Sequence, residues 1–183
     1  MKDPKPLDPL ALDVAAFCRQ GGEMAGDWPL VGLERLAASF AAASDGATRW
    51  RASGELRPVT GGAPEPWLTL QAEAEVPLLC QRCLQPLTES LSFERCFRFV
   101  ATEELAAELD EDSDDEDVLA LPARLDLREL VEDELILSLP IVPRHDDCPE
   151  PLPLPAEPAE AEPDAPHPFA ALAALKGGTK SGA

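Results

Sequence analysis

Residues 66–100 read "PWLTLQAEAEVPLLCQRCLQPLTESLSFERCFRFV", and two alternating patterns follow one another within them. In the first half every even position from Leu68 to Leu78 is apolar, while the odd positions from Thr69 to Glu75 are polar. In the second half the apolar side chains move to odd positions: Leu87, Leu91, Phe93, Phe97 and Phe99. A period of two residues is typical of a strand with one face in solvent. The stretch therefore predicts an antiparallel hairpin with residues 80–86 at its tip.

Further elements are expected before this hairpin. The segment "ATRWRASGEL", about 47–56, predicts another antiparallel strand, with a turn at Gly61-Gly62 after it. The Leu/Ala-rich segment of about 7–43 favours helix, because "LVGLERLAASFAAAS" holds apolar residues at helical spacing. Pro29 suits a first helical turn, and the glycines at 21, 22 and 26 indicate a loop ahead of it.

After the hairpin the sequence predicts two helices with an acidic loop between them. "ATEELAAEL" favours a short helix, and the like charges of "DEDSDDED" favour a flexible, solvated loop at about 110–118. "LDLRELVEDELILSLP" predicts a helix that Asp126 caps, with Glu129 three residues later. Its apolar face holds Leu127, Leu130, Val131 and Leu135. Its solvated side is expected to hold Arg128, Glu129, Glu132 and Asp133.

These elements indicate an α+β fold: an antiparallel sheet with a Cys-x-x-Cys hairpin tip and a few packing helices in one domain, residues 1–148. From 149 to 167 the chain is rich in Pro, Glu and Ala, which predicts a disordered linker. Residues 168–176 follow as a short helical segment with Phe169, Leu172 and Leu175 at helical spacing. Such a segment either docks on a partner or folds back onto its own domain.

Four residues form a candidate zinc site. Cys80 and Cys83 supply two soft ligands on one turn, and "RHDDC" adds His145 and Cys148 with similar spacing. Two alternatives are a redox Cys-x-x-Cys pair, which normally lies at a helix N-terminus, and a turn with two ordinary thiols. Cys18 and Cys96 are expected to be small core or strand residues.

Composition narrows the possible functions. The 183 residues carry a formal net charge of −20 with a pI near 4.3, and such a field repels phosphate backbones. The N-terminus lacks a signal-peptide pattern, and no run approaches the roughly 18 apolar residues of a membrane helix, so we expect a cytosolic protein with reduced thiols. Neither a Gly-rich phosphate loop nor a nucleophile motif occurs, and the sequence therefore gives no indication of an enzyme.

Three motifs, "LLCQRCLQPL", "LVEDELILSLPIVPRHDDC" and "PFAALAALK", occur in an order that resembles the bacterial YceD family of large ribosomal RNA subunit accumulation proteins. The resemblance covers about 66–148 and the short C-terminal segment. It implies a role in the synthesis, processing or stability of the 23S rRNA. Because the sequence lacks catalytic motifs, we expect this role to be non-enzymatic. The matching positions are Cys80, Gln81, Arg82, Cys83, Glu132, Asp133, Glu134, Pro140, Pro143, His145 and Cys148.

The acidic charge indicates how such a protein reaches rRNA. We expect an indirect link, through a basic ribosomal protein or an assembly factor, and the candidate binding residues are Arg82, Glu132, Asp133, Glu134, Phe169, Leu172 and Leu175. Residues 132–134 are either an acidic strip that faces a basic partner or an ordinary solvated helix face. Direct RNA contact would need a local patch such as Arg82, Arg95 and Arg98. The competing interpretations are a zinc- or thiol-dependent RNA-processing or redox enzyme and a general acidic interaction module.

Overall fold

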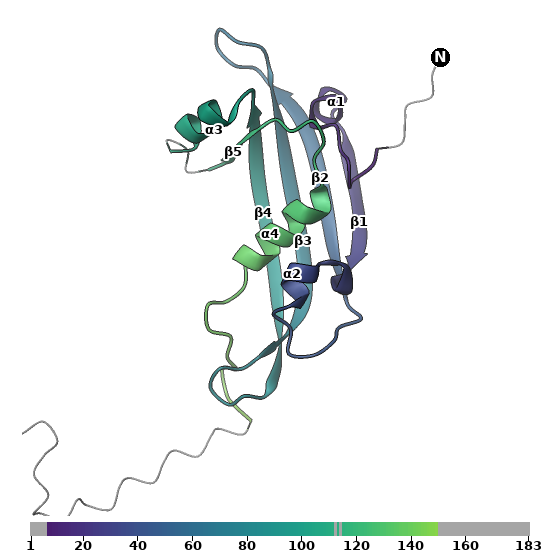
Figure 1. Ribbon diagram of the computed structural model, residues 1–183, viewed down its shortest axis with the longest axis vertical. Coiled ribbons are helices and arrows are strands. Elements are labelled where there is room, and N and C mark those ends of the chain that lie inside the picture. Colours follow the sequence, from purple (N-terminus) through teal and green to yellow (C-terminus); the bar gives the residue numbers. More distant parts are fainter. Residues whose placement is uncertain (1–6, 112, 114, 150–183) are drawn as a thin grey trace, which may run out of the picture. The chain divides into compact units, whose positions relative to one another are not determined.

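One sheet of five strands forms the body of the part that the structure, a computed structural model, describes: residues 7–149 apart from 112 and 114. The strands are β1 (Glu23–Pro29), β2 (Ala47–Arg57), β3 (Glu65–Leu79), β4 (Pro86–Val100) and β5 (Asp117–Ala120). They lie side by side in sequence order (Figure 1). Each of the first four is antiparallel to its neighbour, whereas β5 runs parallel to β4. The predicted α+β class is confirmed, and the sheet is antiparallel as predicted except for β5.

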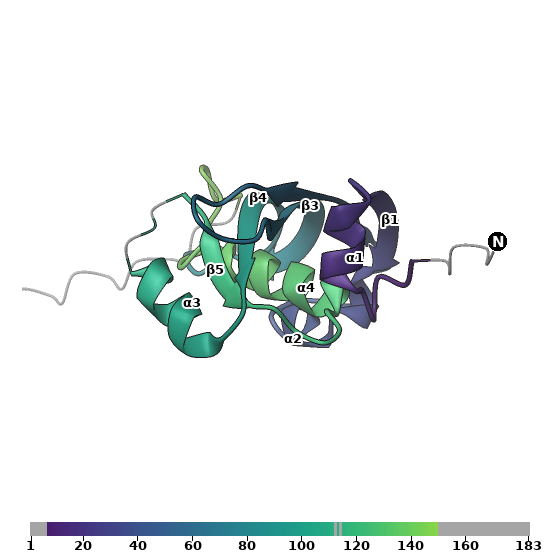
Figure 2. The ribbon, with the colours of Figure 1, turned by 90° about the horizontal axis from the view of Figure 1, so that it is seen from above.

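In the part of the chain that the structure describes, the helices lie on one face of this sheet. α1 (Val14–Arg19), α2 (Glu34–Ala37) and α4 (Leu127–Leu137) lie on that face, and the 3-10 turn η1 (Leu30–Gly32) leads into α2 (Figure 2). α3 (Glu103–Asp110) packs beside β5 at one end of the sheet. Within the described ranges no helix covers the other face of β1–β4, and most side chains at the centre of that face are exposed.

The β3–β4 hairpin forms in the register that the alternating pattern predicts. Leu78 pairs with Leu87 near the tip, and Trp67 pairs with Arg98 at the far end. Even positions of β3 and odd positions of β4 face the helices, so the most deeply buried residues of the two strands are Leu68, Leu70, Val76, Phe97 and Phe99. The strand predicted at 47–56 is β2, and the turn after it contains Gly61 at φ +79°.

The loop predicted around Gly26 and the long helix after Pro29 are wrong. Residues 23–29 form β1, in which Trp28 stacks on Trp50 of β2 with ring centroids 4.4 Å apart. Gly26 lets the Trp50 ring pack closely against β1, because a Cβ atom on residue 26 would lie 3.1 Å from that ring. The predicted helix is limited to η1 and the four residues of α2, although Leu33 and Leu36 are buried as its pattern indicates.

The acidic segment is more ordered at its ends than predicted. The helix expected at its start is α3, whose last residue, Asp110, accepts a hydrogen bond of 2.9 Å from the backbone N–H of Val118. Residues 117–120 form β5, which pairs with Phe97–Val100 of β4. The loop predicted over about 110–118 is therefore shorter, since both of its ends belong to regular elements.

Helix α4 begins at the predicted cap. The Asp126 carboxylate accepts hydrogen bonds from the backbone N–H groups of Arg128 and Glu129, at 2.9 and 3.2 Å. Just before it, Leu125 exchanges two backbone hydrogen bonds with Leu12, at 2.8 and 2.9 Å, and this bridge fixes the helix start to the N-terminal segment. The apolar face of α4 is buried as predicted.

The solvated position predicted for Glu132 is wrong, because only 8% of the residue is exposed. Its carboxylate accepts hydrogen bonds from the backbone N–H groups of Arg35 and Leu36, at 2.7 and 3.1 Å, and from Arg35 Nε at 3.1 Å. Helix α2 has no capping side chain of its own at Leu33. Glu132 therefore caps a helix that lies almost one hundred positions earlier in the chain.

Glu134 is a second buried carboxylate on α4, at 7% exposure. Its Oε2 atom lies 3.2 Å from Arg95 Nε on β4. Burial raises the pKa of Glu134, and the neighbouring Arg95 guanidinium opposes that rise. The two glutamates thus tie α4 to α2 and to β4 respectively.

We expect Glu132→Gln to lower the free energy of unfolding by about 1–3 kcal/mol, since the substitution weakens the cap of α2 and leaves buried donors poorly satisfied. Urea unfolding at pH 7 measures this loss. Asp133→Asn is the matched control, because Asp133 is far more exposed and should change stability by less than about 0.5 kcal/mol. Equal losses in the two variants would contradict the capping role.

Candidate metal centre

The hairpin tip is a tight turn that carries Cys80 and Cys83. The backbone N–H of Cys80 donates to the Gln85 carbonyl at 3.0 Å, and the N–H of Leu84 donates to the Cys80 carbonyl at 2.9 Å. Leu84 lies at φ +59°, a left-handed conformation that favours glycine, and 54% of the residue is exposed. The turn therefore places two thiols close together at the end of the sheet and turns one leucine outward.

The loop after α4 supplies the other half of the site. Gln81 donates its backbone N–H to the Pro143 carbonyl at 2.8 Å. Arg82 donates from one guanidinium nitrogen to the carbonyls of His145 and Asp146, each at 3.0 Å. These bonds join the hairpin tip to residues 143–146 without involving any cysteine.

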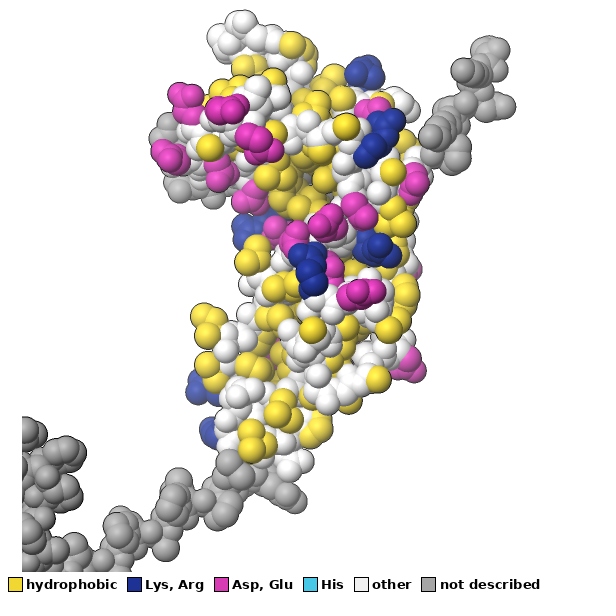
Figure 3. Space-filling model, in the orientation of Figure 1, with side chains coloured by type: hydrophobic (Ala, Val, Ile, Leu, Met, Phe, Trp, Pro, Cys, Tyr) yellow, Lys and Arg dark blue, Asp and Glu magenta, His cyan; other side chains and the backbone are white. Residues whose placement is uncertain are grey.

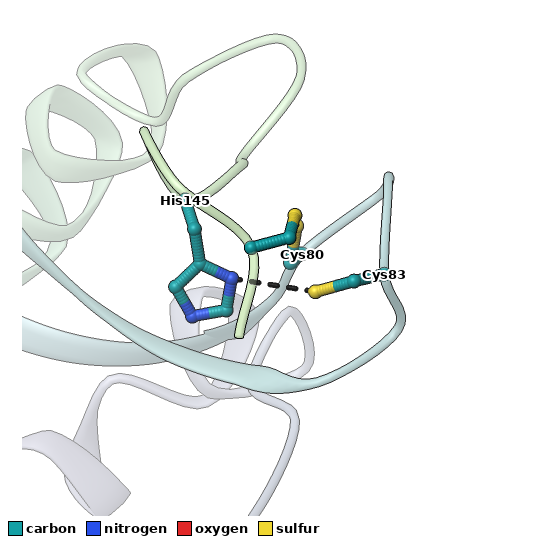
Figure 4. Close-up of side chains that lie close together, drawn as sticks. Cys80, Cys83 and His145 are labelled. Carbon is teal, nitrogen blue, oxygen red and sulfur yellow. Dashed lines mark hydrogen bonds between the residues drawn. The ribbon is translucent and has the colours of Figure 1, made fainter. Parts of the chain in front are cut away.

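Four side chains converge where the two loops meet. The ligand atoms of Cys80, Cys83, His145 and Cys148 all lie within 4.8 Å of one another, and both Cys80 and Cys83 are buried. The sulfurs of Cys80 and Cys148 are 3.8 Å apart, and Cys83 Sγ lies 3.4 Å from His145 Nδ1 (Figure 4). Tetrahedral zinc with ordinary bond lengths separates two sulfurs by about 3.8 Å and a sulfur from a nitrogen by about 3.5 Å. The spacing of the donors therefore fits one zinc ion.

The groups around the four side chains suit a metal site. His145 directs Nδ1 at Cys83, while its Nε2 lies 3.2 Å from the Pro86 carbonyl, a partner that would fix the ring and its tautomer. Arg82 Nε donates to Cys148 Sγ at 3.0 Å. Three thiolates and one Zn²⁺ carry a net charge of −1, and the adjacent guanidinium compensates for it.

The two cysteines of the turn differ in acidity. Burial favours the neutral form of Cys80, but backbone N–H groups of His145, Cys83 and Arg82 point at its sulfur and lower its pKa to about 5. Burial raises the pKa of Cys83 to about 11, and the nearby sulfurs of Cys148 and Cys80 add to the rise. One thiolate is thus present at neutral pH, and a bound cation would stabilise the others.

The predicted partner-binding residues differ in their exposure and in their contacts. Arg82 is exposed but holds the two loops of the site together. Glu132 and Glu134 point inward, and Asp133 contacts Arg35 at 2.5 Å, so the exposed acidic strip predicted at 132–134 does not exist in that form. The linker 149–167, apart from its first residue, and the segment with Phe169, Leu172 and Leu175 lie outside the described residues. Partner binding by any of these residues stays a prediction.

The alternative RNA-binding patch is not assembled. Arg95 pairs with Glu134 and Arg98 pairs with Glu65, at 3.2 and 2.7 Å. The two arginines lie on opposite faces of β4, because three positions separate them in a strand. Arg82 lies at the hairpin tip, away from both.

Sequence reasoning found the four candidate ligands but missed the residues that position them. The roles of Gln81, Arg82 and Pro86 depend on the meeting of two distant loops, which no local pattern reveals. The left-handed conformation of residue 84 could not be read from the sequence either, because glycine usually marks such a position and a leucine stands there.

Fold and site together define an acidic α+β protein with a one-sided sheet and a Cys3His cluster at the end of its long hairpin. The chain matches the family model described as Large ribosomal RNA subunit accumulation protein YceD over residues 68–176. This range is more than half of the chain and contains all four cluster residues, and the protein belongs to this family. No solved structure matches the chain. Among its described residues no helix is long and apolar enough to cross a membrane.

We expect the full chain, purified without chelator, to contain about one zinc ion per molecule. Elemental analysis by mass spectrometry measures it. Cys83→Ser and Cys148→Ser should each remove most of the metal, whereas Cys96→Ser, outside the cluster, should keep it. Less than about 0.2 zinc per wild-type chain would contradict the metal site.

Leu84→Gly should raise the free energy of unfolding by about 0.5–1 kcal/mol, because glycine relieves the left-handed strain but adds freedom to the unfolded chain. Chemical denaturation of the metal-loaded protein measures the gain. Leu84→Ala is the control, since alanine removes the exposed side chain and keeps the strain. A similar gain for alanine would show that strain at this position is not the cause.

Proposed function

We propose that this protein is a non-enzymatic, cytosolic factor in the biogenesis of the large ribosomal subunit and supports accumulation of its 23S rRNA by binding a protein partner. The match to the YceD family over residues 68–176 carries the proposal. The description of that family names accumulation of the large ribosomal subunit RNA. Charge and the geometry of the cluster support the rest of the proposal.

Charge supports a protein partner over direct RNA binding. The chain has a net charge of −20, which repels the phosphates of RNA over distances shorter than the screening length of the salt. Six of its arginines are already in ion pairs with carboxylates in the described part: Arg35, Arg49, Arg57, Arg95, Arg98 and Arg124. These pairs reduce the number of guanidinium groups that are free to neutralise an RNA backbone.

The geometry of the cluster supports a structural role for the metal. Catalytic zinc sites usually keep one coordination position for water or substrate, whereas structural sites use four protein ligands. Cys80, Cys83, His145 and Cys148 would fill all four positions of a tetrahedral ion. The metal would then fix the hairpin tip to the loop after α4 and leave no position for a reactant.

The alternative is a thiol-dependent enzyme that uses Cys80 and Cys83, which the low pKa of Cys80 favours. Burial of both thiols at a hairpin tip argues against it, since a reactive thiol has to be reached by its substrate. Circular dichroism of Cys83→Ser separates the two roles. An enzyme would keep its fold and lose activity, while a structural site would lose both.

We expect cells without this protein to show a lower ratio of 23S to 16S rRNA and fewer large subunits on a sucrose gradient. Wild-type protein and Cys96→Ser should restore both quantities, and Cys83→Ser should not. Quantitative RNA electrophoresis measures the ratio. An unchanged ratio in the deletion strain would refute the proposed function.

A further inference from the structure

The face of the sheet opposite the helices is a feature of the described residues that the proposed function does not use. We call it the open face: the outward side chains of β1–β4 at the centre of the sheet. Strand register places Asp27, Arg49, Glu73 and Ser92 in one row across it, and Ala25, Arg51, Gln71 and Glu94 in the next. Glu75 and Ser90 pair in the row beyond.

The open face is hollowed. One hollow of about 770 Å³ lies over the first two rows, and a second of about 730 Å³ continues from it toward the loop of residues 43–46. They share Asp27, Arg49, Glu73 and Ser92, so they form one continuous trough. Its combined size suits a polypeptide segment better than a single small metabolite.

The choice of residues keeps this trough open. A strand face that is exposed to solvent and binds nothing can hold long side chains. β-branched residues on such a face would stabilise the sheet. Positions 25, 90 and 92 instead carry alanine and serine, which leave space between their neighbours. Glu75 pairs across the strands with Ser90, and Glu94 pairs with Gln71, so neither carboxylate has a basic cross-strand partner.

Charge identifies the kind of occupant. The two hollows are lined by five carboxylates, those of Asp27, Asp45, Glu73, Glu75 and Glu94, and by two guanidinium groups, those of Arg49 and Arg51. Arg49 is bound by Glu73 and lies 3.9 Å from Asp27, so its charge is already compensated. The trough therefore repels phosphate and attracts lysine and arginine side chains.

We propose that the open face binds a lysine- and arginine-rich segment of a large-subunit ribosomal protein, with the carboxylates of Glu75 and Glu94 as its exposed anchors. The assignment to a ribosomal protein rests on the proposed function, whereas the basic chemistry of the segment rests on the trough itself. Hydroxyls of Ser90 and Ser92 add hydrogen-bond acceptors beside the carboxylates.

Site-specific photo-crosslinking in cells tests the location. A benzophenone amino acid replaces Ser92 in the trough and, as the control, Ala107 on α3, which is also exposed. Acidic side chains gather over α3 as well (Figure 3). We expect adducts with a basic large-subunit ribosomal protein from position 92 and none from position 107. Adducts with RNA, or equal adducts from the two positions, would overturn the proposal.

Binding of the purified, identified protein to the full chain then tests the chemistry. E75Q/E94Q should weaken the Kd by roughly three- to ten-fold, and the effect should shrink as salt rises. The matched control is E103Q/E108Q, which removes two exposed carboxylates from α3 and should leave the Kd unchanged. R51E should tighten binding, a gain that no misfolded variant would show. Equal weakening by both double variants would mean that only net charge acts, and it would overturn the site.

The same strains separate this inference from the proposed function. If the deletion lowers 23S rRNA but E75Q/E94Q restores it fully, the function holds and the trough is not its binding site. If the deletion leaves 23S rRNA unchanged while position 92 still crosslinks to a basic protein outside the ribosome, the surface holds and its ribosomal assignment is overturned.

Discussion

Two buried carboxylates on α4 hold the packing between this helix, α2 and the sheet. Glu132 supplies the cap that α2 lacks, and Glu134 pairs with Arg95 of β4, so one helix is fixed both to a neighbouring helix and to the sheet. A helix of four residues is too short to be stable alone, and Glu132 of α4 caps its first turn. The end of α4 in turn sets the starting point of the loop that carries His145 and Cys148. A buried charge without a partner is costly. The apolar stripe of α4 alone would permit several placements of the helix, and the need to pair both carboxylates favours one of them.

The candidate metal centre and part of the open face lie on the same two long strands, β3 and β4, at different positions along them. The cluster closes the end of the β3–β4 hairpin against the loop after α4, and hydrogen bonds from Gln81 and Arg82 reinforce that closure. The trough lies further along these strands, where their outward side chains are small or acidic. A rigid hairpin keeps the rows of carboxylates in register, because strands that cannot slip cannot move a side chain to the other face. Family membership places both features in a protein linked to accumulation of the large-subunit rRNA.

Sequence patterns predicted the parts of the fold that local periodicity controls. The β3–β4 hairpin, β2, α3 and the Asp126 cap all follow from short-range spacing, as does the choice of the four candidate ligands. The failures have a common physical origin in distant contacts. β1 resembles a loop because its glycine is needed for a neighbouring tryptophan ring, and β5 is four residues that become a strand only beside Phe97–Val100. Glu132 looks solvated on a helical projection, since nothing in the projection reveals that Arg35 approaches that side. Glu134 falls within the apolar stripe, seven residues after Leu127, and the sequence does not reveal that Arg95 pairs with it there.

The separation of the ligands along the chain has a consequence for how the protein matures. Cys80 and Cys83 are neighbours on one turn, whereas Cys148 follows Cys80 by 68 positions, with β4, α3, β5 and α4 between them. Bringing Cys148 to Cys80 closes a long loop, and the entropy cost of this closure comes before the new contacts compensate for it. The pair of Cys80 and Cys83 on the turn therefore forms well before the site with all four ligands. An ion that needs all four ligands would be captured late, after α4 has docked on the sheet. Metal occupancy would then report that a newly made chain has finished folding, and zinc shortage would leave a pool of chains whose hairpin is formed and whose last loop is not.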